Sequence, residues 1–120
     1  MAKYMLLIYS DIKRWADLPE AEQQAINTDY FTYTQELIEA GVMQGGDPLV
    51  GHEETKTVAQ GGVVTDGPHV EAAEHLGGYY IIDVPDAGTA VQWAGKLPGV
   101  GRGVDRIEVR PIMVLPDMPS

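Results

Sequence analysis

The sequence predicts an α+β fold of the ferredoxin-like type, in which a split βαβ sheet carries an inserted β-hairpin. Three observations predict it: two apolar runs typical of buried strands, two amphipathic segments that lie between strands, and a glycine turn flanked by β-branched residues. A chain of 120 residues is the usual length of one domain. We therefore expect a single domain over residues 1–120, with about 112–120 as a carboxy-terminal tail.

The first strand and the first helix follow each other directly. Residues 4–9 are apolar without polar alternation, which is typical of a strand covered on both faces. Pro19, followed by acidic residues, indicates a helix start, and we expect this helix to end near residue 40 with Gly41 as a left-handed cap. The apolar positions of the helix recur every three or four residues: Ile26, Tyr30, Tyr33, Leu37 and Ala40.

The middle of the chain predicts a short strand and a hairpin. Residues 42–44 suit a strand, and Gly45-Gly46-Asp47-Pro48 is expected to break regular structure. Residues 55–59 and 63–65 carry β-branched side chains on either side of Gln60-Gly61-Gly62, a turn suited to positive φ. The hairpin is therefore an insertion between the two halves of the fold.

The second half repeats the pattern of the first. Residues 77–84 predict a strand buried on two sides, and Pro85-Asp86 opens a helix that Pro98-Gly99 stops. A glycine-rich loop over 99–103 leads to 106–110, where two apolar residues alternate with three charged ones as on a half-exposed strand. The resulting order is β-α-β, hairpin, β-α-β.

The apolar strands also predict an assembly. Two helices cover only one face of a sheet, yet residues 4–9 and 79–82 place large apolar side chains on both faces. Leaving such side chains in water forgoes about 1.5–3 kcal/mol each, and twofold pairing of two sheets is the simplest cover. We predict a homodimer, the alternative being that loop 45–55 of the same chain covers this face.

Composition excludes several classes of function. Eighteen acidic residues against eight Lys and Arg give a net charge of −10, which disfavours nucleic acid as a partner. The chain has no Cys, and Ser stands only at positions 10 and 120, so a Ser or Cys nucleophile is nearly excluded. The longest amino-terminal apolar run, 4–9, is too short for a membrane span, so we expect a cytoplasmic protein that does not engage membranes. The glycine clusters lack the context of a phosphate cradle, and we predict no cofactor.

Four tracts, at 3–9, 64–68, 76–80 and 107–111, together resemble the DGPF branch of the YCII-related family over nearly the whole chain. The second tract contains the Asp-Gly-Pro motif, and His69 stands where that family has Phe. The resemblance implies a dimeric α+β barrel without an established reaction for most members. It also implies genes that often lie near extracytoplasmic-function sigma factors, and some relatives that look like enzymes using a His and Asp pair.

The Asp-Gly-Pro turn supplies the candidate catalytic residues. Asp66 and His69 are three residues apart across a tight turn, a spacing at which a carboxylate can orient an imidazole for general acid/base chemistry. The competing interpretation is turn chemistry alone, because Asp begins turns by bonding to its own backbone.

Further candidates are ligand contacts rather than catalytic groups. Tyr9 and Arg110 stand near strand ends, where a hydroxyl and a cation can meet an anionic ligand, although both residues also suit a structural role. We add Gly67 of the turn and Trp15, whose alternative role is packing.

A metal site is not predicted. His75 with His69 and either Glu71 or Glu74 matches no compact zinc spacing, and His52-Glu53-Glu54 is expected to be an exposed loop.

The function that the sequence favours is a small-molecule-binding homodimer. Proton transfer, isomerisation or elimination in its cavity would use Asp66 as base with help from His69, and whether turnover occurs is left open. The alternative is a non-catalytic accessory protein in a sigma-factor-linked response, whose acidic surface meets a basic partner.

Overall fold

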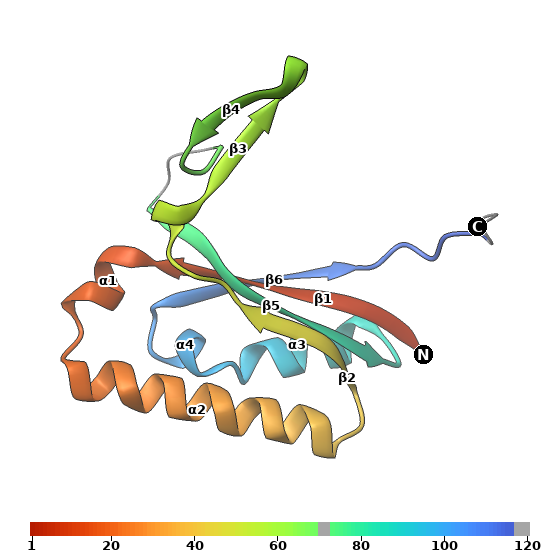
Figure 1. Ribbon diagram of the computed structural model, residues 1–120. Coiled ribbons are helices and arrows are strands. Elements are labelled where there is room, and N and C mark those ends of the chain that lie inside the picture. The colour runs from red at the N-terminus through yellow and green to blue at the C-terminus, as the bar shows by residue number, and fades with distance from the viewer. Residues whose placement is uncertain (70–72, 117–120) are drawn as a thin grey trace.

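The computed structural model describes residues 1–69 and 73–116 of the chain. Its main strands and helices are β1 (Ala2–Asp11), α2 (Glu20–Glu39), β2 (Met43–Pro48), β5 (Glu74–Val84), α3 (Ala87–Gly95) and β6 (Asp105–Pro111). The four strands form one open antiparallel sheet, in the order β2-β5-β1-β6. Figure 1 shows that α2 and α3 lie on the same face of this sheet.

The strand order is that of a ferredoxin-like fold. Strand β1 is central and pairs with both β5 and β6, while β2 pairs with the outer side of β5. The units β1-α2-β2 and β5-α3-β6 are therefore two βαβ units, each of which is split by a strand of the other. The predicted fold class and order of elements are confirmed.

The core lies between the sheet and the helices. Leu6 of β1 and Ile82 and Val84 of β5 are fully buried, as are Leu37 of α2 and Leu97 after α3. Successive residues of a strand point to opposite faces, so this core uses every second position of β1 and β5. The same alternation leaves the intervening apolar side chains on the uncovered face.

Helix α2 matches its prediction closely. It begins directly after Pro19 and ends one residue before Ala40, and Gly41 adopts a left-handed φ of 73°. Ile26, Tyr33 and Leu37 are its buried residues. The three-and-four spacing of apolar residues was therefore a correct guide to the face that meets the sheet.

A short helix, α1 (Ile12–Asp17), was not predicted. It has no buried residue, so its sequence lacks the apolar periodicity that would predict a helix. It starts instead at Asp11, whose carboxylate accepts a hydrogen bond of 3.0 Å from the backbone N–H of Arg14.

The prediction that regular structure breaks over residues 45–48 was wrong, because β2 runs through them. Gly46 has a φ of 152°, and a Cβ there would lie 2.6 Å from the carbonyl oxygen of Tyr79. Glycine at this position lets the edge strand come close to β5 rather than ending the strand. Loop 45–55 is thus in part an edge strand of the sheet.

The predicted hairpin is confirmed, with β3 (Lys56–Ala59) and β4 (Val63–Asp66) paired antiparallel. A 3₁₀ turn, Gln60–Gly62, joins them, and Gly61 and Gly62 have positive φ angles of 79° and 76°. Another 3₁₀ turn, His52–Glu54, precedes the hairpin. The hairpin projects from the sheet on the side opposite the helices (Figure 1).

The boundaries in the second half differ from prediction by a few residues. Strand β5 begins at Glu74 rather than at 77, because β1 continues to pair with it as far as Asp11. The expected glycine-rich loop over 99–103 is partly the short helix α4 (Pro98–Gly101). Strand β6 begins one residue earlier than expected, at Asp105.

The second face of the sheet carries half-buried apolar side chains. Met5 and Leu7 alternate with the core residues of β1, and Tyr79 and Ile81 do the same on β5. We call these four residues the open face. Among the described residues, no helix is both long and apolar enough to cross a membrane.

Candidate functional site

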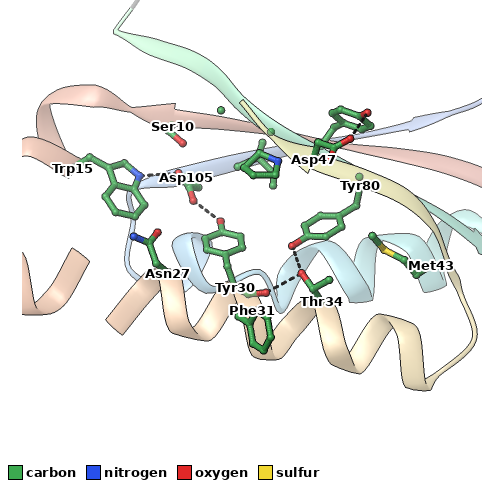
Figure 2. Close-up of a pocket in the computed structure, with 16 residues that line it drawn as sticks. Ser10, Trp15, Asn27, Tyr30, Phe31, Thr34, Met43, Asp47, Tyr80 and Asp105 are labelled. Atoms are coloured by element: carbon green, nitrogen blue, oxygen red, sulfur yellow. Dashed lines mark hydrogen bonds between the residues drawn. The ribbon is translucent and has the colours of Figure 1, made fainter. Parts of the chain in front are cut away.

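A cavity of about 420 Å³ lies between the middle of α2 and the sheet. Figure 2 shows side chains from α1, α2, β2, β5 and β6 that line it. Aromatic rings make up much of the wall, and hydroxyl and carboxylate groups interrupt it. A largely apolar cavity with a few convergent polar groups is the usual form of a small-molecule site.

Asp105 is the buried acid of this cavity, with 6% of its surface exposed. Its Oδ1 accepts a hydrogen bond of 3.2 Å from the Trp15 indole N–H. Its Oδ2 accepts a hydrogen bond from the Tyr30 hydroxyl (Figure 2). Because both oxygens act as acceptors, the pattern is that of an ionised carboxylate held by two donors.

The backbone around Asp105 explains why this acid can lie inside. Gly99 packs directly against the carboxylate, and a Cβ at that residue would lie 1.8 Å from Oδ2. The N–H of Val104 donates to the Gly99 carbonyl, 3.0 Å away, which closes the loop before β6. Only glycine leaves room for the carboxylate there.

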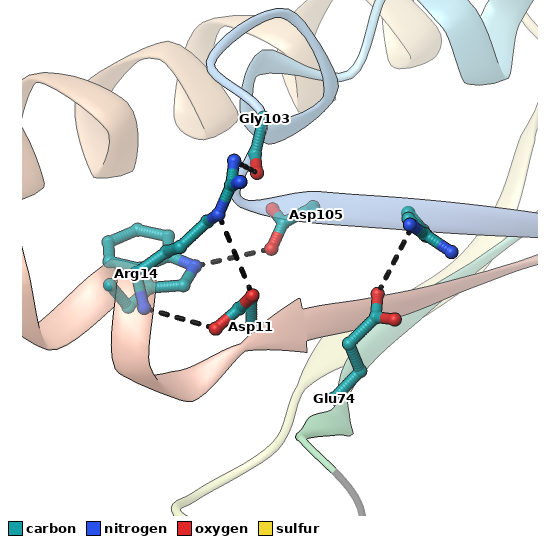
Figure 3. A network of polar contacts seen from close by, with 7 residues as sticks. Asp11, Arg14, Glu74, Gly103 and Asp105 are labelled. Carbon is teal, nitrogen blue, oxygen red and sulfur yellow. Dashed lines mark hydrogen bonds and ion pairs between the residues drawn. The ribbon is translucent and has the colours of Figure 1, made fainter.

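A polar network fixes α1 against the same loop (Figure 3). The Arg14 guanidinium donates to the Gly103 carbonyl at 3.1 Å and lies 3.8 Å from the Asp11 carboxylate. The backbone N–H of Asp11 donates to Val104 at 2.8 Å. These contacts hold α1, and with it the indole of Trp15, beside Asp105.

Tyr30 provides the hydroxyl group that donates to Asp105. Burial is the main cause that raises the pKa of Tyr30, and the hydrogen bond and the charge of Asp105 raise it further. The phenol is therefore neutral throughout the physiological pH range and acts as a proton donor toward the carboxylate.

Other hydroxyls extend the polar lining toward β2 and β5. The Thr34 and Tyr80 hydroxyls are 2.7 Å apart, and Thr34 also donates to the Tyr30 carbonyl at 2.9 Å. Burial raises the pKa of Tyr80. On the other face of the sheet, the Tyr79 hydroxyl donates to Asp47 at 3.3 Å.

This arrangement suits proton movement more than nucleophilic attack. The Tyr30 hydroxyl donates a hydrogen bond to the Asp105 carboxylate in the wall of a largely apolar cavity. Such a pair can take a proton from a bound molecule or donate a hydrogen bond to it.

The structure places the predicted catalytic residues outside this cavity. Asp66 lies exposed on the hairpin strand β4 and forms an ion pair with Lys56. His69 is also exposed. Neither residue lines the cavity, and their role stays a prediction.

The four residues predicted to contact a ligand lie in different parts of the molecule. Trp15 lines the cavity. Tyr9 and Arg110 lie on the side of the sheet away from the helices, where the Tyr9 hydroxyl donates to Glu108 at 3.4 Å. Burial and then the Glu108 charge raise the pKa of Tyr9. Gly67 has a φ of 95° and its N–H donates to Thr55 at 2.7 Å, as in a structural turn.

The histidines near the hairpin make a contact that the sequence did not predict. The rings of His52 and His75 stack with centroids 4.3 Å apart and an angle of 11° between planes. The expectation that His52 is simply part of an exposed loop was therefore incomplete. Glu71 lies outside the described residues. Within the described ranges, no group of three or more His, Asp or Glu residues is arranged to hold a metal ion.

Sequence reasoning missed Asp105 and assigned Tyr30 only to the helix core. One signal was available, because Asp105 shares the two-residue alternation of Ile107 and Val109, which pack against the core. An acid in a core-facing register is unusual and indicates a functional or paired carboxylate. That signal depended on beginning the strand one residue earlier.

Comparison with known proteins shows which proteins this chain is similar to. An uncharacterised protein of Rhizobium meliloti strain 1021 is 27% identical over 112 residues, which cover 91% of this chain and 90% of that protein. A solved structure of 5-chloro-2-hydroxyhydroquinone dehydrochlorinase from Burkholderia phenoliruptrix AC1100, in complex with 2,5-dihydroxybenzoquinone, has 17% identity. It covers 88% of this chain and 90% of its own, with a TM-score of 0.47. The sequence model of the YCII-related domain matches residues 2–115, and the chain therefore belongs to the YCII-related family.

Proposed function

We propose that this protein binds an organic small molecule in the cavity beside α2 and moves a proton on it with the Tyr30–Asp105 pair. The observation that carries the proposal is a buried carboxylate hydrogen-bonded to a phenol inside a cavity of about 420 Å³. Carboxylates inside largely apolar cavities are well suited to act as general bases, because little water competes for them.

The proposed step is a relay with a balanced proton count. The Tyr30 oxygen takes a proton from the bound molecule, while the Tyr30 proton passes to Oδ2 of Asp105. The Trp15 indole keeps Oδ1 occupied and the carboxylate oriented. Proton transfer, isomerisation and elimination all begin with such an abstraction.

The pair Asp66 and His69 is the other proposed source of acid/base chemistry. Both side chains are exposed, and Asp66 is already paired with Lys56. An exposed carboxylate in water gains little as a base, so burial favours the cavity pair.

A Kemp elimination tests the base without knowledge of the natural substrate. A base removes the C3 proton of 5-nitrobenzisoxazole, the N–O bond breaks, and a coloured cyanophenolate forms. Asp105→Asn removes the proton acceptor, and we expect it to lower the rate by roughly 10²-fold. Tyr30→Phe removes the hydroxyl of the relay and should also lower the rate.

The matched control is Tyr33→Phe on the same helix, because the Tyr33 hydroxyl donates to the Trp93 carbonyl at 2.8 Å and does not line the cavity. This variant should keep the wild-type rate. Loss of activity in Asp66→Asn with full activity in Asp105→Asn would instead support the hairpin pair. Equal rates in wild type and all variants would end the catalytic proposal.

We also propose that two copies pair through their open faces. Met5, Leu7, Tyr79 and Ile81 are half-buried apolar residues on the face without helices. In the described residues, the buried Oδ1 of Asp83 on this face has no hydrogen-bond partner. A second copy would cover the apolar side chains and offer donors to this oxygen.

A further inference from the structure

We infer that the ligand of the cavity is an organic cation, an amine attached to an apolar body. This inference rests on the proposed function, since it specifies what the same cavity takes. It goes beyond that proposal because it commits to the ligand's charge.

The charged groups around the cavity have one sign. The Asp105 carboxylate lies in its wall, and no Lys, Arg or His side chain of the described residues lines it. All eight Lys and Arg residues and the three His residues lie within the described ranges. An anionic ligand would therefore meet a buried carboxylate without a compensating cation.

The nearest basic side chain is already engaged elsewhere. Arg14 binds the Gly103 carbonyl and approaches Asp11, and its side chain is 66% exposed (Figure 3). It is not part of the cavity lining. Its role is to hold α1 rather than to receive a ligand carboxylate or phosphate.

The walls suit a cation with apolar substituents. Four aromatic side chains line the cavity: Trp15, Tyr30, Phe31 and Tyr80. Aromatic ring faces attract ammonium groups, Trp most strongly, and the attraction increases where water is excluded. Phe31 is 69% exposed and lies at the edge of the cavity.

The net charge of the whole molecule also favours a cationic ligand. The net charge of −10 concentrates cations near the surface and repels anions. Asp105 adds a negative charge in the wall of the cavity itself.

A series of matched probes tests the inference. 2-Phenylethylamine, 2-phenylethanol and phenylacetate share a ring and a two-carbon chain, and at pH 7 they are cationic, neutral and anionic. Titrations followed by the indole N–H signals of Trp15 and Trp93 in NMR give the affinity and the place of binding. We expect the amine to bind roughly 10-fold tighter than the alcohol and to shift Trp15, with phenylacetate weakest.

Two variants locate the source of the preference. Asp105→Asn should reduce the advantage of the amine over the alcohol, because it removes the carboxylate in the cavity wall. Glu39→Gln removes an exposed charge at the carboxy-terminal end of α2, and it should leave the advantage of the amine unchanged. Added salt should weaken the amine more than the alcohol.

The outcomes separate the inference from the proposed function. Binding of the alcohol or phenylacetate at Trp15 as tightly as the amine overturns the cation preference and keeps the cavity as the site. Absence of any shift at Trp15 with all three probes overturns the cavity as a binding site and the inference with it.

Discussion

Asp105 depends on one glycine for its place in the cavity. The carboxylate occupies the volume that a side chain at position 99 would fill, 1.8 Å from the ideal Cβ. It accepts hydrogen bonds from Trp15 and Tyr30, so its displacement would leave buried donors without partners. The absence of a side chain at Gly99 therefore decides where the Asp105 carboxylate lies, and the proposed chemistry depends on that carboxylate.

Gly99→Ala tests this link. We expect a loss of about 1–3 kcal/mol in the free energy of unfolding, because the methyl group must displace the carboxylate. The Trp15 indole signal should move as its acceptor moves. Urea unfolding and an NMR spectrum of the variant measure both effects.

Gly101→Ala is the control in the same short helix α4, since a Cβ there meets nothing within 4 Å. We expect this variant to keep the free energy of unfolding or to raise it by up to about 1 kcal/mol, because alanine has less conformational freedom than glycine in the unfolded chain. A Gly99→Ala protein as stable as Gly101→Ala, with an unmoved Trp15 signal, would contradict the close packing.

At the scale of elements, local caps start two of the helices. Asp11 caps α1, and Asp86 caps α3 by accepting from the backbone N–H and the hydroxyl of Thr89, both at 2.8 Å. Helix α3 has only 9 residues and includes Gly88 and Gly95, and glycine is a weaker helix former than Ala. The cap therefore matters more to α3 than it would to a strong helix former.

The Asp86 cap predicts a pH dependence. Its hydrogen bonds to Thr89 lower the pKa of Asp86 below the usual 3.8 in the folded protein. The charged cap thus contributes stability that is fully present above the unfolded pKa and is lost as pH falls through the folded pKa. Asp86→Ala should be less stable than wild type at pH 7, and the difference should shrink in acid.

Urea unfolding of wild type and variant at pH 7 and at about pH 3 measures this difference. Asp17→Ala at the exposed end of α1 removes a carboxylate without a cap and should show no such pH dependence. A difference for Asp86→Ala that stays constant over this range would show that its charge has no part in the cap.

At the scale of the whole molecule, the sheet has one covered and one uncovered face. Helices α2 and α3 lie on the same side, while the hairpin projects on the other (Figure 1). Val58, Val63 and Val64 of the hairpin are exposed as well. This distribution of apolar surface is the basis of the proposed dimer.

Leu7→Lys tests the dimer through the middle of the open face. We expect wild type to have the mass of a dimer and Leu7→Lys that of a monomer, because a buried unpaired ammonium group is costly. Light scattering after size-exclusion chromatography measures both masses at micromolar concentration.

Val91→Lys places the same charge on an exposed apolar site of α3, on the helix side of the molecule, and should remain dimeric. A wild-type protein that is monomeric under these conditions would remove the dimer proposal. Monomers from both variants would show a general loss of stability rather than an interface at Leu7.

Sequence periodicity by itself determined the ferredoxin-like order of elements and the buried face of α2. Spacing between apolar residues reports directly which side chains share a face, as it did for Ile26, Tyr33 and Leu37. The hairpin was equally readable, because Gly61 and Gly62 supply the positive φ angles its turn requires. These signals are local, so no knowledge of distant segments was needed.

Only the tertiary structure decided where the candidate site lies. Trp15, Tyr30 and Asp105 meet although 75 residues separate the Tyr and the Asp, and no local pattern encodes that meeting. Strand β2 likewise continues through Gly46 because β5 lies close beside it. A polar group's chemistry depends on the partners and the burial that folding gives it, and folding brings these from distant parts of the chain.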